Sequence, residues 1–87
     1  MPNAFVLLNT EMGREEDIIR DLKNLEEVKE VFRVYGVYDI IAKVESDTMD
    51  KVRKITTWKL RKLKDVRSTL TLIVTEEVYK VFLSLDI

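Results

Sequence analysis

The chain of 87 residues contains no cysteine and no histidine, and it has only two glycines and one proline. Without cysteine it can form neither a disulfide nor a thiolate metal site. Without histidine it lacks the usual general base, the commonest zinc ligand and every Ser-His or Cys-His pair. The two glycines, Gly13 and Gly36, cannot make a GxGxxG or Walker loop. We therefore expect a protein that is not an enzyme and has no cofactor and no metal site.

Charge is balanced over the whole chain, with a formal net charge of −1, but it is distributed unevenly. Eight acids and four bases lie between Glu11 and Glu30, whereas eight bases and the single acid Asp65 lie between Lys51 and Arg67. A dedicated nucleic-acid binder is usually basic overall, so the net charge argues against that class. A charged solvent-facing surface is the simpler interpretation of the basic segment, and mutual attraction between copies of the chain is an alternative.

No apolar run approaches the ~20 residues that span a bilayer, and we find no signal peptide. The sequence accordingly predicts a cytoplasmic protein with no membrane partner. Its length suits a single domain over residues 1–87.

Hydrophobic periodicity predicts six elements in the order β-α-β-β-α-β. They are strands over Ala4–Thr10, Val28–Tyr35, Tyr38–Glu45 and Val66–Thr75, a helix over Arg14–Leu25, and a second helix opened by Ser46 or Asp47 as N-cap. This order is that of the ferredoxin-like α+β fold, in which two helices cover one face of a four-stranded antiparallel sheet. The apolar stripes of the two helices are predicted to be Ile18, Ile19, Leu22 and Leu25, and Met49, Val52, Ile55, Thr56, Leu60 and Leu63.

Two residues of the second helix do not fit its apolar stripe. Lys59 falls on the stripe by angle, so we expect the helix to fray or bend there. Trp58 points away from it, which predicts either a side chain tucked at the helix flank or a contact with another chain.

The second face of the predicted sheet carries too much apolar surface to be left in water. The residues assigned to it are Phe5, Leu7, Ile41 and Ile73. Because large exposed apolar areas usually mark interfaces, we expect a second copy to cover this face, sheet to sheet, as a dimeric α/β barrel. The segment Val78–Ile87 alternates apolar and polar residues, which predicts an extra C-terminal strand, with a helix as the alternative.

A hairpin over Val34–Ala42 is the most informative stretch. Gly36 can take a positive φ in its turn, and Asp39 is the only charge between Arg33 and Lys43. Either Asp39 accepts hydrogen bonds from amides of its own turn, or it faces the positive group of a ligand.

Under the second interpretation a small zwitterion is held without catalysis. Asp39 takes the ammonium, while turn amides and hydroxyls take the carboxylate. The candidate residues are Tyr35, Gly36, Tyr38, Asp39, Ser68, Thr69 and Thr71. The alternative for Thr69 and Thr71 is that they are simply β-branched strand residues facing a neighbour.

Three ordered segments resemble the effector-binding domain, or RAM domain, of the Lrp/AsnC (feast/famine) transcriptional regulators. They are Tyr35–Ile40 (YGVYDI), Asp47-Thr48 and Val66–Val74 (VRSTLTLIV). The resemblance implies a ferredoxin-like fold, dimers formed sheet to sheet, and assembly into octamers or similar rings. It also implies an amino-acid effector bound near the G-x-x-D turn, where Gly36 and Asp39 match. Ser68, Thr69 and Thr71 match the hydroxyl-bearing strand, and Tyr35, Val37 and Tyr38 are neighbours of the turn.

The chain departs from these regulators because it begins at the first strand, without their helix-turn-helix. We expect a stand-alone domain with no direct DNA binding that modulates transcription by assembling with full-length regulators. One alternative is an ACT-like amino-acid-binding module. Another is a small cofactor-less dimeric α/β-barrel enzyme, for which only Trp58 and Asn9 are available.

Overall fold

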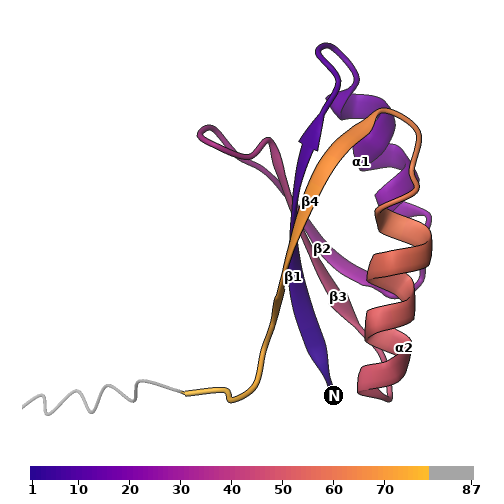
Figure 1. The fold of residues 1–87 in the computed structure, drawn as a ribbon, viewed down its shortest axis with the longest axis vertical. Coiled ribbons are helices and arrows are strands. Elements are labelled where there is room, and N and C mark those ends of the chain that lie inside the picture. Colours follow the sequence, from indigo (N-terminus) through magenta and orange to yellow (C-terminus); the bar gives the residue numbers. More distant parts are fainter. Residues whose placement is uncertain (79–87) are drawn as a thin grey trace, which may run out of the picture.

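The computed structural model describes residues 1–78, which fold into one antiparallel sheet and two helical segments (Figure 1). The elements are β1 (Asn3–Thr10), α1 (Glu15–Lys23), β2 (Val28–Arg33), β3 (Ile40–Glu45), α2 (Met49–Lys54), the π-helical turn η1 (Ile55–Leu60) and β4 (Val66–Ile73). The strand order is β2-β3-β1-β4 with antiparallel pairing throughout. Figure 1 shows the helices on one face of the sheet, so the predicted ferredoxin-like α+β fold is confirmed.

The core lies between the sheet and this helical layer. Alternate residues of the two central strands point into it because successive strand side chains face opposite sides. The fully buried members are Ala4, Val6 and Leu8 of β1, Ile40, Ala42 and Val44 of β3, and Ile18, Leu22, Val52 and Leu60 of the helices. The predicted helix stripes are therefore confirmed, with Ile19, Leu25, Met49 and Leu63 packed at the margin.

The second helix begins one or two residues later than predicted. Its N-cap is Thr48, whose hydroxyl accepts a hydrogen bond from the Lys51 amide at 3.2 Å, rather than Ser46 or Asp47. Asp47 instead pairs with Lys51 through its side chain, at 3.0 Å.

The expected irregularity at Lys59 is a widened helical turn. The Arg61 amide donates to the Thr56 carbonyl, five residues back, at 3.1 Å. This extra residue in the turn keeps Leu60 in the core and leaves Lys59 outside, where its ammonium pairs with Glu27 at 3.4 Å.

The face of the sheet away from the helices is apolar, as predicted, but one of its members was assigned wrongly. Phe5, Leu7 and Ile41 lie on this open face, since they alternate with the buried residues of β1 and β3. Ile73 pairs with buried Ala4 and so lies on the helix side. Alternation along β4 separates its residues into two sets but does not say which set faces the helices. Only the pairing of β4 with β1 decides that, so the sequence assigned Ile73 to the wrong face.

Leu70 and Leu72 occupy the open face in place of Ile73, opposite Leu7 and Phe5. They are 44% and 51% exposed, and Phe32 beside Ile41 is 47% exposed. We call Phe5, Leu7, Phe32, Ile41, Leu70 and Leu72 the open-face cluster.

The connection between β2 and β3 is longer than the predicted two-residue turn. Six residues, 34–39, form a loop that projects from the sheet (Figure 1), and the Val34 amide closes it on the Asp39 carbonyl at 2.9 Å. Gly36 in this loop has φ 154°, a positive value as expected.

The predicted strand over Val78–Ile87 lies, apart from Val78, outside the described residues. Within residues 1–78, none of the helices has the length and apolar character needed to cross a bilayer.

Candidate ligand-binding site

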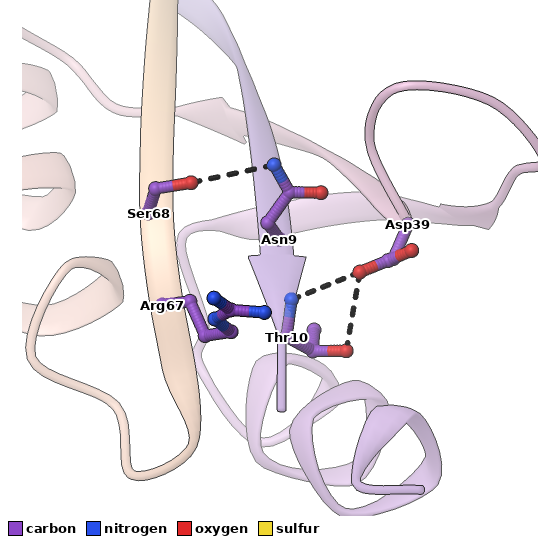
Figure 2. A pocket seen from close by; sticks show the side chains of 5 residues that line it. All are labelled: Asn9, Thr10, Asp39, Arg67 and Ser68. Carbon is purple, nitrogen blue, oxygen red and sulfur yellow. Dashed lines mark hydrogen bonds between the residues drawn. The ribbon is translucent and has the colours of Figure 1, made fainter. Parts of the chain in front are cut away.

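Asp39 is held where the projecting loop joins β3, beside the end of β1. Its amide donates to the Leu8 carbonyl at 3.0 Å, which extends the pairing of β3 with β1 by one residue. Its carboxylate Oδ2 accepts from the Thr10 amide at 2.9 Å and from the Thr10 hydroxyl at 3.4 Å (Figure 2). These contacts fix the position of the carboxylate.

The first interpretation of Asp39 is right that the carboxylate accepts a backbone hydrogen bond but wrong about its source, and the second stays a prediction. The carboxylate does accept a backbone hydrogen bond, but from Thr10, 29 residues earlier, and not from its own turn. Its other oxygen, Oδ1, accepts no hydrogen bond from residues 1–78, so it keeps acceptor capacity for a donor from outside.

Arg67 and Ser68 reach the same place from β4. Asn9 pairs with Ser68, and the Asn9 side-chain amide donates to the Ser68 hydroxyl at 3.3 Å. The register then shifts, so that Thr10 pairs with Val66 and Arg67 is the extra residue of a bulge. A bulge re-aims the side chain it carries. By simple alternation Arg67 and Ser68 face opposite sides of the strand, yet both line one depression.

The depression has a volume of about 480 Å³ and is lined by Asn9, Thr10, Asp39, Arg67 and Ser68 (Figure 2). It combines one carboxylate, one guanidinium, two hydroxyls and one carboxamide. The Arg67 guanidinium is mostly exposed, and among residues 1–78 its only ion pair is with Glu11, at 3.8 Å. Such an exposed pair contributes little and does not prevent Arg67 from binding an anion.

The structure brings together only two of the predicted site residues, Asp39 and Ser68. Tyr35, Gly36 and Val37 are exposed in the projecting loop, and Tyr38 is partly buried at its base. Thr69 pairs with Leu8, and Thr71 pairs with Val6, so both lie on the helix side of β4. They are therefore on the opposite face from Ser68.

Three residues of the depression were missed from the sequence: Asn9, Thr10 and Arg67. Asn9 and Thr10 are the polar residues that end β1. Because β1 and the strand after Asp39 neighbour each other in this fold, these two residues could have been placed beside Asp39 from the sequence. Arg67 could not have been placed there, because the bulge that aims it depends on the pairing of β1 with β4.

Comparison with known proteins identifies the family. The family model described as the Lrp/AsnC ligand binding domain matches residues 3–82, which is nearly the whole chain. The chain belongs to this Lrp/AsnC family. A search of curated protein sequences gave no significant match.

Solved structures agree with this assignment to the Lrp/AsnC family. The protein described as FFRP-DM1 is 40% identical, with a TM-score of 0.82 over 85% of this chain and 99% of its own. The hypothetical protein PHS023 from Pyrococcus horikoshii is also 40% identical, with a TM-score of 0.81 over 88% of this chain and 93% of its own. E. coli AsnC shares the fold at 23% identity, with a TM-score of 0.83 over 94% of this chain but only 56% of AsnC.

Membership of the Lrp/AsnC family makes this chain an effector-binding regulatory domain and decides against the ACT-like alternative. Within residues 1–78, the depression includes only one of the two residues available to the enzyme alternative. Asn9 lines the depression on β1, whereas Trp58 is exposed on the outer side of η1.

Proposed function

We propose that the chain binds a free amino acid, or a related small zwitterion, in the depression lined by Asp39 and Arg67. The observation that carries this proposal is the presence of both charges in one depression, with Asp39 Oδ1 open to a donor. The ligand ammonium binds Asp39, and its carboxylate binds Arg67 with help from Asn9 and Ser68. A transcriptional regulator from Neisseria meningitidis with the same fold was solved with L-Met, which supports an amino acid as the effector class.

The projecting loop belongs to the proposed site through a neighbouring copy. Tyr35, Gly36 and Val37 are exposed on a loop that extends away from its own sheet, so they are available to a ligand held by another copy (Figure 1). We include Tyr38 with them, because it follows in the same loop. Thr69 and Thr71 face away from the depression, so we assign them no direct contact with the effector.

We further propose that two copies pair through the open-face cluster and that such dimers assemble into an octamer- or decamer-like ring. In the cell, this domain would modulate transcription by assembling with full-length Lrp/AsnC regulators. Support comes from the exposed apolar side chains of the cluster, which a single copy leaves in water.

The effector proposal is tested by thermal unfolding against a panel of the common amino acids at fixed protein concentration. Concentration is held constant because the melting temperature of an oligomer depends on it. An effector at ~100 times its dissociation constant adds ~2.7 kcal/mol to native stability, which is seen as a rise in Tm. We expect a selective rise with one or a few amino acids.

The matched variants are Asp39→Asn and Asp21→Asn. Asp39→Asn keeps an oxygen that accepts from the Thr10 amide but removes the charge that binds the ammonium, so it should lose the rise in Tm. Asp21 is exposed on α1, so Asp21→Asn should keep it. A flat panel with the wild-type chain, or an undiminished rise with Asp39→Asn, contradicts the proposed site.

A further inference from the structure

The outward side of α2, η1 and the turn after them carries an unusual excess of positive charge. Seven bases and no acid occur from Lys51 to Lys64. On α1, the other helix of the layer, acids and bases are mixed and pair with one another, as Asp17 does with Arg20 at 2.6 Å. Like charges on neighbouring helical turns destabilise a helix by some tenths of a kcal/mol, so local helix stability does not account for this excess.

Five of the seven cations have no ion-pair partner within residues 1–78. Lys51 pairs with Asp47, and Lys59 pairs with Glu27. The remaining five are all exposed, and they are Arg53, Lys54, Arg61, Lys62 and Lys64. We call these five residues, together with Trp58, the basic surface. It lies on the outer side of the helix, because Val52, Ile55 and Leu60 turn the other side into the core.

Trp58 lies in the middle of the basic surface and is 63% exposed. The Lys62 ammonium lies 4.1 Å from the centre of its ring, a cation–π contact that covers one side of the indole. An indole is the largest aromatic side chain, and leaving it mostly in water forgoes the stabilisation that burial would give. The exposed indole of Trp58 therefore lies among the five cations, where one partner can contact both.

We propose that the basic surface binds single-stranded nucleic acid, with phosphates on the cations and a base stacked on Trp58. Grooves of positive charge that contain aromatic side chains are how proteins bind single strands without reading sequence. The helical part of the basic surface, from Arg53 to Leu60, is about 10 Å long at a rise of 1.5 Å per residue, and Arg61, Lys62 and Lys64 extend the surface through the following turn. The whole surface accommodates several successive phosphates.

Other partners fit the basic surface less well. A protein interface is built around several apolar anchors, whereas this surface has only Trp58. An interfacial membrane helix must turn its apolar side outward, but here that side faces the core. Duplex DNA keeps its bases stacked inside, so it would engage the cations and leave the indole unused.

The net charge of the chain argued against a dedicated nucleic-acid binder, and the missing helix-turn-helix predicted no direct DNA binding. The basic surface differs from both expectations because its charge is local and it needs no helix-turn-helix. The acids that balance the chain lie mainly between Glu11 and Glu30, on α1, β2 and their connections. Because salt at 0.1 M screens charges beyond about 10 Å, the net charge of the whole chain does not measure the charge of one local surface. The surface uses none of the residues of the effector depression, so either proposal can fail without the other.

Trp58 is the only tryptophan, so fluorescence excited at a wavelength that tyrosine does not absorb reports on the basic surface. The test titrates the full chain with a single-stranded oligothymidine of about 12 nucleotides, within the range that small domains bind. We expect saturable quenching that weakens with salt. If all five cations contact phosphates, the slope of log affinity against log salt concentration is about −3.5, at about −0.7 for each contact.

Two variants locate the binding, measured by anisotropy of a labelled oligothymidine. Arg61→Glu should lower the affinity about ten-fold at low salt, whereas Lys23→Glu, an equal charge change at an exposed position of α1, should leave it unchanged. Trp58→Leu should lower it at least about five-fold, since stacking contributes ~1–3 kcal/mol for each base. Thermal unfolding checks that each variant is folded.

Four results would overturn the proposal. They are a lack of quenching in the wild-type chain, equal losses with Arg61→Glu and Lys23→Glu, unchanged affinity with Trp58→Leu, and equal or tighter binding of a competitor. The competitors are a duplex of the same length, polyglutamate and vesicles containing phosphatidylglycerol.

Discussion

At the residue scale, Asp39 joins the end of β1, which is 29 residues earlier at Thr10, to the loop in which it lies. Its carboxylate accepts from Thr10 at the end of β1, its amide continues the β1–β3 ladder, and its carbonyl accepts from Val34 across the loop. Asp39 therefore closes the projecting loop through its backbone carbonyl and anchors that loop to β1 through its carboxylate. Among the described residues only Oδ2 is engaged, so the structural role of Asp39 leaves Oδ1 for the proposed binding role.

Removing the Asp39 carboxylate should destabilise the fold even without a ligand. In Asp39→Ala the Thr10 amide, in a residue that is 5% exposed, loses its acceptor, at a cost of about 1–3 kcal/mol. Asp39→Asn retains an acceptor and should cost less. Urea denaturation at one protein concentration measures both, as a shift in midpoint with unchanged slope. Equal destabilisation by the two variants would show that the charge, and not the hydrogen bond, stabilises the loop.

At the element scale, the two helices of one layer differ in how their charge is arranged. The first turn of α1 contains Glu15, Glu16 and Asp17, and its last turn contains Arg20 and Lys23. This arrangement complements the helix dipole and gives these acids a structural role. α2 and η1 lack such balance, which is why the basic surface stands out.

The pairing within α1 predicts a pH dependence. The hydrogen bond from Arg20 holds the pKa of the Asp17 carboxyl below its ordinary value of 3.8, and Arg14 adds to the effect. A depressed pKa in the folded state contributes stability above the unfolded value, and this stability is lost as pH falls through the folded pKa. Because Asp17 is near the surface, the contribution is small and screened by salt.

Arg20→Gln should therefore raise the pKa of Asp17 toward 3.8, because it removes the positive charge and the strongest of its hydrogen bonds. Titration of the Asp17 carboxyl carbon by NMR measures this directly. As a control, Lys23→Gln alters a base of the same turn that makes no ion pair within the described part of the chain. If Lys23→Gln raised the pKa as much as Arg20→Gln did, general helix electrostatics rather than the specific pair would be responsible.

At the scale of the whole molecule, the sheet is covered on one face only. The helices bury alternate residues of β1 and β3, while the open-face cluster remains partly in water. A domain of this size buries a limited fraction of its surface, so covering a second face matters for its stability. This is the physical basis for the proposed pairing of two copies.

Charge placed within the open-face cluster should separate the proposed dimer. Leu7 and Leu70 are directly opposed on this face, so Leu7→Lys combined with Leu70→Lys puts two like charges at its centre. We expect a monomer by sedimentation velocity at micromolar concentration, where the wild-type chain is a dimer or larger. Met12→Lys, at a residue that is 95% exposed in a turn outside the sheet, should leave the assembly intact. A wild-type monomer would contradict the proposed pairing.

The sequence by itself determined the element order, the fold class and most of the core. Apolar residues at helical and strand spacing fixed these features, because each depends on near neighbours along the chain. It also identified Asp39 as unusual, since a lone carboxylate among apolar residues is visible without a structure.

Only the tertiary structure decided which residues meet Asp39 and which side of the sheet each β4 residue faces. Thr10 and Arg67 reach the depression through the pairing of β1 with β3 and β4, and through the bulge at Arg67. The same register places Ile73 on the helix side of the sheet and places Leu70 and Leu72 on the open face. A register shift of one residue moves every side chain of a strand to the other face of the sheet. The register is set by contacts between segments far apart in sequence. Local pattern cannot supply that information.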